Sequence, residues 1–241
     1  MMSNLEFLSL SENHLNEIIP PSVYNMKQLR VLSLRSNQFH GEFRHAGSVG
    51  CSMMFLDVSQ NNLSGNIPTS LGVLSSLEVL KLNNNNFNGK ISNSLQNCSR
   101  LTSINLGDNK LFGKIPQWIG GLNVSKLFML RLRSNHFSGH IPQQLCNLRQ
   151  LGILDLSNNI SGTISECLGN LSPMVNGSKN TSFFLEQTVL TLKGMELVYN
   201  MTRDLVRSID LSSNNLQGEI REEISIIIQL GTLNLSSNQL T

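Results

Sequence analysis

Two histidines, His136 and His140, stand four residues apart in the segment HFSGH. On a helix this spacing would place both imidazoles on one face, where they could bind a metal ion. Here the segment is typical of a turn, and a sequence repeat assigns both histidines to variable positions. The sequence has no zinc-protease motif, no phosphate-binding glycine loop and no nucleophile elbow. We therefore expect no enzyme activity, no metal site and no cofactor.

Several asparagines lie in Asn-x-Ser/Thr triplets, which permit a glycan on an exposed asparagine of a secreted chain. We expect glycans at Asn97, Asn123, Asn176 and Asn180. Asn159 also begins such a triplet, but the repeat gives it a structural role, so we expect it to be bare. The triplets favour an extracellular compartment.

The elements that would position these residues come from a repeat of 24 residues. Nine segments follow the pattern L-x-x-L-x-L-x-x-N-x-L, as in LRVLSLRSNQF and LEVLKLNNNNF. They begin at Leu5, Leu29, Met53, Leu77, Leu101, Leu127, Leu151, Val206 and Leu230. In L-x-L the two leucines point to the same side of a short strand. One such coil cannot bury its leucines, but a stack of coils can. The sequence therefore predicts an α/β-type solenoid, mostly β, with a parallel sheet on its concave face.

The asparagine that closes the pattern recurs once in every coil. Its amide carries both donors and acceptors, and buried polar groups are almost always hydrogen-bonded. We therefore expect these residues to be buried and to bond the turns of adjacent coils as a ladder. The predicted ladder is formed by Asn13, Asn37, Asn61, Asn85, Asn109, Asn135, Asn159, Asn214 and Asn238.

A second pattern, G-x-I-P, follows in several coils, as in LSGNIPTSLGVL. Glycine suits a tight turn, and the residue before proline favours extended backbone. This pattern predicts a short second strand and then a loose or 3₁₀ turn. The seventh coil, LSNNISGTI, is one residue short, and we place the deletion between Asn159 and Ile160. A local kink or a tightened turn is expected there.

The residues beside the L-x-L leucines should line the concave face. They mix apolar side chains with charges of both signs, as binding faces do, and arginine or lysine there could bind carboxylates of a peptide or protein. For any single position an ordinary solvated residue is the favoured interpretation, so the prediction concerns the set. The candidate ligand-binding residues are Arg35, Asp57, Lys81, Asn105, Arg131, Arg133, Asp155 and Asp210.

The repeat predicts that two of the four cysteines form a disulfide and that the other two do not. Cys146 and Cys167 occupy nearly equal positions in neighbouring coils, about 5 Å apart at the sheet, which is within the range for a disulfide. We predict that they are bonded. Cys51 and Cys98 lie two coils apart, too far to pair, and should be small buried apolar residues.

The composition narrows the class of protein further. A net charge of +2 and 14% charged residues give no reason to expect a nucleic-acid or membrane-surface partner. With 39% apolar residues the chain can form a core, so disorder is disfavoured. Alanine occurs only at Ala46, which argues against a helix-rich enzyme core. The N-terminus has no features of a signal peptide, and no apolar run approaches the roughly 20 residues that span a bilayer.

The full repeat L-x-x-L-x-L-x-x-N-x-L-x-G-x-I-P resembles the plant extracellular leucine-rich repeat, a right-handed superhelix. A narrower resemblance, to kinase-less plant receptor-like proteins, is carried by LRSNHFSGHIPQQLCNLRQLGILDLSNN with ECLGN, and by VLTLKGMELVYNMTRDLVRSIDLSSNNLQGEI with LGTLNLSSNQLT. Such receptors have a non-repeat insert, the island, before their last repeats. The resemblance implies repeats 1–7 in residues 1–168, an island in 169–204 whose TVLTLKGMELVY supplies strands, and repeats 8–9 in 205–241, the last truncated.

Three functions are compatible with this resemblance. The first is an extracellular recognition module that binds a peptide or protein ligand and a partner receptor kinase at the plasma membrane, in defence or development. Its anchor would lie outside this chain. The second is a secreted inhibitor of microbial wall-degrading enzymes, such as polygalacturonases, although that class has no island. The third is a receptor fragment without independent activity, because neither end shows a capping unit.

Overall fold

The structure is a computed structural model. It describes residues 4–44, 52–121, 126–165, 168, 187–192, 195–200, 207–220, 222 and 230–241.

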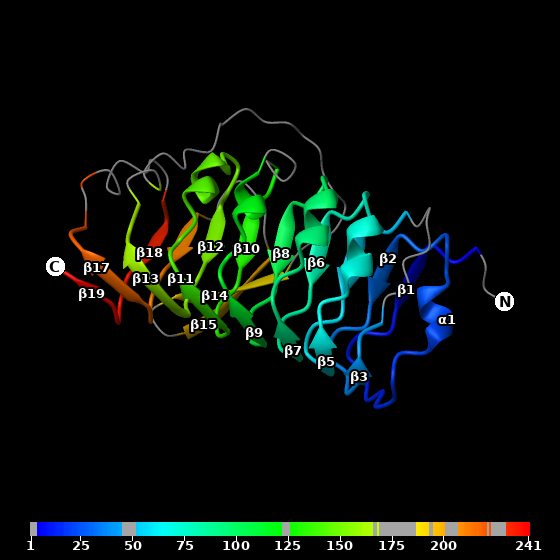
Figure 1. Ribbon diagram of the computed structural model, residues 1–241. Coiled ribbons are helices and arrows are strands. Elements are labelled where there is room, and N and C mark those ends of the chain that lie inside the picture. Colours follow the sequence, from blue (N-terminus) through cyan, green and yellow to red (C-terminus); the bar gives the residue numbers. More distant parts are fainter. Residues whose placement is uncertain are drawn as a thin grey trace.

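The repeat builds a solenoid in which each coil contributes one short strand to a parallel first sheet (Figure 1). Neighbouring strands pair residue for residue with the equivalent strand of the next coil, for example Leu56 with Leu80. The nine strands, in spatial order, are β1 (Phe7–Ser9), β2 (Val31–Ser33), β4 (Phe55–Asp57), β6 (Val79–Lys81), β8 (Ser103–Asn105), β10 (Met129–Arg131), β12 (Ile153–Asp155), β16 (Ser208–Asp210) and β18 (Thr232–Asn234).

The G-x-I-P region forms a second parallel set of strands along another side of the solenoid. The glycine of each pattern adopts a positive φ, for example +94° at Gly113. Residues with a side chain rarely adopt this conformation, so glycine is required there. The strands, in chain order, are β3 (His40–Glu42), β5 (Asn62–Asn66), β7 (Asn86–Gly89), β9 (Lys110–Gly113), β11 (His136–Gly139), β13 (Asn159–Thr163), β17 (Asn215–Gly218) and β19 (Gln239–Leu240).

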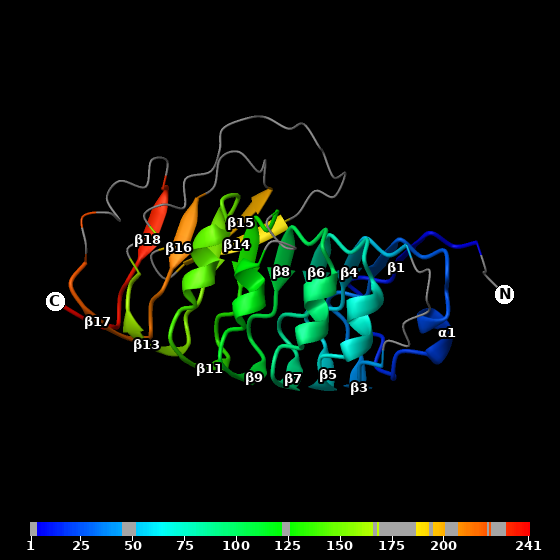
Figure 2. The ribbon, with the colours of Figure 1, turned by 45° about the horizontal axis from the view of Figure 1, so that its top comes forward.

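Short helical turns close the coils on the third side. Proline precedes or opens most of them. Pro68, Pro116 and Pro142 are N-cap residues with extended backbone, and Pro21 is the first residue of α1, where its missing N–H removes no helical hydrogen bond. The turns are α1 (Pro21–Tyr24), η1 (Thr69–Val73), η2 (Asn93–Asn97), η3 (Gln117–Gly120) and η5 (Gln143–Asn147). Figure 2 shows these turns in front, the first sheet behind them and the second sheet along the lower edge.

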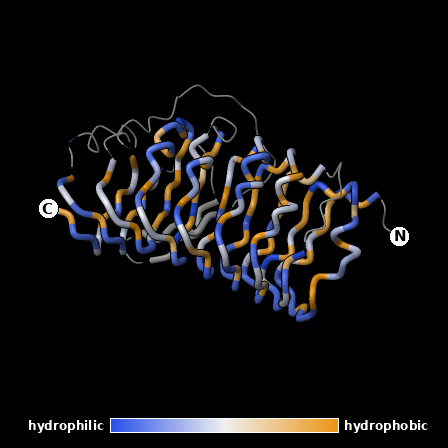
Figure 3. The backbone as a smooth tube through the Cα atoms, in the orientation of Figure 1, coloured by the Kyte–Doolittle hydropathy of each residue, from blue (hydrophilic) through white to orange (hydrophobic). Residues whose placement is uncertain are grey.

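The core is the interior of this three-sided stack. Leu56, Leu80 and Leu130 of the first sheet are fully buried, as are Phe87 and Phe137 of the second. Hydrophobic (orange) and hydrophilic (blue) residues therefore alternate along the coils in Figure 3. The apolar residues of each coil face the core, and the polar ones face solvent. The prediction of a mostly β, leucine-rich solenoid is confirmed.

One antiparallel hairpin interrupts the repeat. Its strands are β14 (Gln187–Leu192) and β15 (Met195–Asn200), in the stretch that we expected to supply strands. Figures 1 and 2 place it on the same side of the molecule as the first sheet. Strand β12 nevertheless pairs directly with β16, so the insert leaves the first sheet unbroken. In the described part of the chain, no helix is long and apolar enough to cross a membrane.

Candidate ligand-binding face

The outward side of the first sheet carries a single row of polar residues, one from each coil. The strand register places each of them directly beside its equivalent in the next coil. The row, which we call the polar row, consists of Ser9, Ser33, Asp57, Lys81, Asn105, Arg131, Asp155, Asp210 and Asn234. Six of the eight predicted ligand-binding residues belong to the polar row. Because neighbouring coils are about 5 Å apart, the row forms one continuous surface.

The carboxylates of two acidic members of the polar row accept hydrogen bonds from a serine of the same coil. Asp57 Oδ1 accepts hydrogen bonds from the backbone N (2.9 Å) and the hydroxyl (2.6 Å) of Ser59. Asp210 Oδ1 accepts the equivalent pair from Ser212 at the same distances. Both carboxylates therefore hold the turn that follows the strand, a role that the sequence-based prediction of ligand binding missed. The signal was present in the sequence as the repeated pattern D-x-S.

The other predicted residues of the first four coils also have local contacts. Arg35 Nε donates to Gln60 Oε1 at 3.5 Å, and Lys81 Nζ lies 5.9 Å from the centroid of the Phe55 ring. Arg35 lies four coils, roughly 19 Å, from Arg133. The structure thus does not unite all eight residues in one site. It brings together five of them, Asn105, Arg131, Arg133, Asp155 and Asp210.

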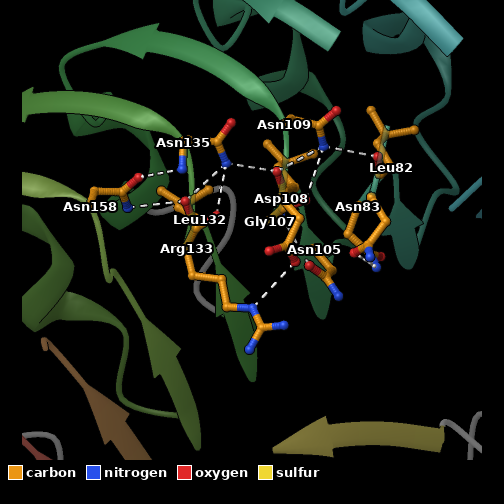
Figure 4. Close-up of polar contacts among 12 residues, drawn as sticks. Leu82, Asn83, Asn105, Gly107, Asp108, Asn109, Leu132, Arg133, Asn135 and Asn158 are labelled. Atoms are coloured by element: carbon orange, nitrogen blue, oxygen red, sulfur yellow. Dashed lines mark hydrogen bonds and ion pairs between the residues drawn. The ribbon is translucent and has the colours of Figure 1, made fainter. Parts of the chain in front are cut away.

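Two arginines are the most distinctive feature of this group. Arg131 follows Asn105 in the polar row and is buried, and Arg133 lies two residues further along the same coil. Arg133 Nε forms an ion pair with Asp108 Oδ2 at 3.3 Å, and both side chains remain partly exposed (Figure 4). The preceding coil has Gly107 at the position equivalent to Arg133. A Cβ there would lie only 3.2 Å from Arg133 Cγ, so the glycine provides room for the arginine stem.

Asp155 is the titratable group of this surface whose environment is most unusual. It pairs in register with Arg131 on one side and Asp210 on the other, and it is buried. Burial raises the pKa of the Asp155 carboxyl to about 6, the charges of Arg131 and Arg133 oppose that rise, and Asp210 adds to it. Among the described residues, Oδ1 of Asp155 has no hydrogen-bond partner.

The ladder asparagines fix the turns that carry these arginines. Asn109 Nδ2 donates to the carbonyl oxygens of Leu82, Leu106 and Gly107 at 3.0–3.1 Å (Figure 4). Its Oδ1 accepts from Phe87 N at 2.9 Å. The same pattern links coils at Asn37, Asn61, Asn85, Asn135, Asn214 and Asn238. The side-chain amide of Asn13, in the first coil, donates to Leu10 O and Ser11 O of its own turn, while its backbone N donates to Ser36 O of the next coil.

The prediction that Asn159 belongs to the ladder is wrong. Asn158 occupies the position instead, since its Nδ2 donates to Leu132 O at 3.0 Å and its Oδ1 accepts from Asn135 N at 2.9 Å. In eight coils a left-handed residue with φ of 52–58° precedes the ladder asparagine, and the seventh coil lacks it. The deletion therefore precedes Asn158. Asn159 is exposed at the start of β13, which removes the reason for expecting it to be bare.

The remaining sequence predictions concern cysteines and glycans. Cys146 is disulfide-bonded, whereas Cys167 lies outside the described residues, so their pairing stays a prediction. Cys98 is free and buried, and burial raises the pKa of its thiol to about 11. Asn97 is exposed on η2. Cys51 and the triplets at Asn123, Asn176 and Asn180 lie outside the described residues.

Comparison with known proteins identifies the repeat. The Leucine Rich Repeat family matches residues 4–26, 52–74, 76–98, 100–122, 126–148 and 205–226, more than half of the chain. The chain belongs to the leucine-rich-repeat family. A search of curated proteins by sequence found no match.

Several solved structures share the architecture of this leucine-rich-repeat chain. The Arabidopsis receptor kinase HAESA, in complex with the peptide hormone IDA and the co-receptor SERK1, is 32% identical, with a TM-score of 0.80 over 99% of this chain and 35% of that one. The plant peptide hormone receptor RGFR1, in complex with RGF2, is 28% identical, with a TM-score of 0.69 over 99% and 40%.

A plant ice-binding protein is also similar in fold, at 22% identity and a TM-score of 0.74 over 97% of this chain and 65% of that one. This chain spans 35–40% of the length of the two receptor structures above. It is similar to a plant extracellular leucine-rich-repeat receptor segment.

Proposed function

We propose that this chain is part of the ectodomain of a plant leucine-rich-repeat receptor-like protein that binds an extracellular peptide or protein on the outward side of its first sheet. In this proposal a partner receptor kinase of the plasma membrane joins the complex, and the residues around 169–204 form the island. The proposed receptor would signal in defence or in development, as the resemblance to plant receptor-like proteins implies. The similarity to receptors solved with peptide hormones supports a ligand-binding role.

The observation that carries the proposal is the arginine pair of the sixth coil. Arg131 and Arg133 belong to one coil, and Asp108 of the preceding coil orients Arg133. Guanidinium groups bind carboxylates through paired, charge-assisted hydrogen bonds. A ligand with a carboxylate, at a side chain or at the C-terminus of a peptide, would meet the partly exposed Arg133 directly, and the charge of the buried Arg131 would add to the attraction.

A peptide-binding experiment tests the proposal. Synthetic dodecapeptides with free C-terminal carboxylates, each paired with its C-terminal amide, are screened against the purified chain. We expect binders whose Kd rises at least about tenfold with Arg131→Ala/Arg133→Ala. Arg100→Ala/Arg149→Ala removes the same charge from exposed positions next to the 3₁₀ turns and should leave the Kd within about twofold. Absence of binders, or equal loss in both double variants, would contradict the proposal.

A further inference from the structure

The second sheet carries a basic surface that plays no part in the proposed ligand-binding face. In β9 the side chains alternate between buried and exposed, so that Leu111 is buried while Lys110, Phe112 and the following Lys114 are exposed. The neighbouring coils continue the pattern with exposed Lys90 after β7, exposed His136 in β11 and exposed His140 directly after β11. We call the set Lys90, Lys110, Phe112, Lys114, His136 and His140 the basic face.

An exposed aromatic ring lies at the centre of the basic face. Phe112 is 47% exposed, and it stands where the adjacent strands carry the exposed Asn88 and Ser138, whereas Phe87 and Phe137 take the buried position of Leu111. Along β9 Phe112 lies two residues from Lys110, on the same side of the strand, and the exposed Lys114 follows the end of the strand. Across the sheet Phe112 pairs with His136 of β11.

On the other side of β9, Gly89 of β7 pairs with Leu111. The next residue after Gly89, Lys90, therefore lies beside the next residue after Leu111, Phe112. The ring position is therefore surrounded by basic residues along the strand and across it.

The lysine side chains are held in place by glycines. A Cβ built on Gly113 would lie 3.2 Å from Lys90 Cγ and 3.6 Å from its Cδ and Cε. Gly139 has the same relation to Lys114, at 3.3 Å and 3.7 Å. Each lysine stem thus lies along the bare backbone of the next coil, which directs successive ammonium groups along the solenoid. Binding a ligand there costs less side-chain entropy than it would with free lysines.

The charge of the basic face is uncompensated within its own strands. Strands β7, β9 and β11 and the residues that follow them contain no aspartate or glutamate. Among the described residues, no carboxylate forms an ion pair with any of the three lysines. Exposed amides and hydroxyls come from Asn88 and Ser138 of these strands and from Asn159 of the adjacent β13. The exposed carboxylate of Glu42 in the same sheet lies on β3, two strands away from β7, where it forms an ion pair with Arg44. In Figure 3 the lower edge of the solenoid, where these strands lie, is largely hydrophilic.

We propose that the basic face binds a linear acidic polysaccharide, a polyuronate in which each sugar carries one carboxylate. Sugar rings have an apolar face that stacks on an aromatic ring, and Phe112 supplies one. The lysine ammonium groups attract the carboxylates, while Asn88, Ser138 and Asn159 offer donors and acceptors to the sugar hydroxyls.

An extended acidic peptide suits this surface less well. Backbone groups in the interior of a sheet already bond the neighbouring strands, so none remain to pair with another chain. A polymer that is recognised through side chains alone, with repeated charges and hydroxyls, fits better. The proposal uses a different sheet from the proposed peptide-binding face and does not depend on it.

The test is a binding measurement with polygalacturonate, by calorimetry at low salt. Lys90→Gln/Lys114→Gln should raise the Kd at least about tenfold, because two directed charges are lost. Phe112→Ala should raise it about fivefold through loss of stacking. The control Lys27→Gln/Lys126→Gln removes the same charge from exposed positions elsewhere and should change the Kd less than about twofold.

Three further ligands separate the explanations. Fully methyl-esterified polygalacturonate keeps the sugar rings without the charge and should bind at least about tenfold more weakly. Poly-glutamate and vesicles of anionic phospholipid keep the charge without the sugar, and their affinity should not depend on Phe112. Equal loss with the control variant, or binding of poly-glutamate as tight and as dependent on Phe112 as that of polygalacturonate, would overturn the proposal.

Discussion

At the scale of single residues, the asparagine ladder shows how a polar side chain can hold an apolar stack together. The turns after the first sheet run through the interior, where unpaired backbone groups are costly. One amide supplies donors to three carbonyl oxygens and accepts one backbone N–H, as Asn109 does. An aliphatic residue in this place would leave the N–H of Phe87 without its acceptor and would remove one donor from each of three carbonyl oxygens, which explains why the position recurs as asparagine.

Replacement of Asn109 by alanine should therefore lower the free energy of unfolding by about 3 kcal/mol, since it removes four hydrogen bonds to backbone groups and leaves the N–H of Phe87 without an acceptor. Guanidinium denaturation measures this change. The matched control is Asn159→Ala, in a host that adds no glycans, because Asn159 is exposed and outside the ladder. It should change stability by less than about 0.5 kcal/mol. A larger loss at Asn159 than at Asn109 would contradict the assignment of Asn158 to the ladder.

Asp155 should make stability depend on pH in a defined direction. Its pKa in the folded chain is about 6, above the ordinary value of 3.8, so the folded state binds the proton more tightly than the unfolded state. The buried carboxylate therefore destabilises the fold above pH 6, and this penalty disappears as the pH falls from 6 to 4.

Asp155→Asn should remove a penalty of up to about 3 kcal/mol at pH 7.5 and almost none at pH 4. Denaturation of both proteins at the two pH values gives the comparison. A difference between variant and wild type that is the same at both pH values would show that the carboxyl charge is not responsible.

At the scale of elements, much of the fold could be predicted from the sequence. The period of 24 residues and the L-x-L alternation predicted the first sheet and its register, because a parallel stack brings equivalent positions of successive coils side by side. The polar row followed from the same register. The seventh coil could not be predicted in detail, since a deletion beside two consecutive asparagines fits either one. Only the missing left-handed residue decides for Asn158.

The candidate site was less predictable than the fold. Spacing placed Asp57 and Arg131 in one row, and the D-x-S pattern was compatible with a contact between Asp57 and Ser59, but only the side-chain rotamers of the structure establish it. The same limit applied to Asp108, which orients Arg133 from the preceding coil. The exposure of Phe112 was indicated by the repeat, because Leu111 takes the buried position of Phe87 and Phe137 while Phe112 stands where Asn88 and Ser138 are exposed. The repeat did not single out the aromatic character of this one position.

The 3₁₀ turns limit how closely the coils can stack. Gly120 of η3 lies against the backbone of η5, and a methyl group on it would overlap the carbonyl oxygen of Gln144. Gly120→Ala should therefore force the two coils apart and lower stability by about 2–3 kcal/mol. The control Gly231→Ala places a methyl 3.4 Å from Arg207 O, an ordinary contact, and should be nearly neutral. Thermal denaturation compares them, and equal effects would argue against the close packing of η3 on η5.

At the scale of the whole molecule, the solenoid has no central core that every element contacts. Each strand of the first sheet pairs only with its two neighbours, and the ladder bonds also join adjacent coils. Stability in such a stack is the sum of the coils and their interfaces, so a local defect should remain local. Both proposed binding faces depend on the stacking of adjacent coils, because each face consists of residues from successive coils that the strand register places side by side.

Leu106→Ala tests this expectation. Leu106 is fully buried in the fifth coil, and its truncation should cost about 3 kcal/mol. Native-state hydrogen exchange should then show faster opening in β6, β8 and β10, which flank the cavity, while β2 and β16 keep most of their protection. The matched substitution Leu10→Ala, in the half-buried first coil, should affect only β1 and β2. A uniform loss of protection along the chain would instead show that the stack unfolds as one cooperative unit, and that local changes reach both faces.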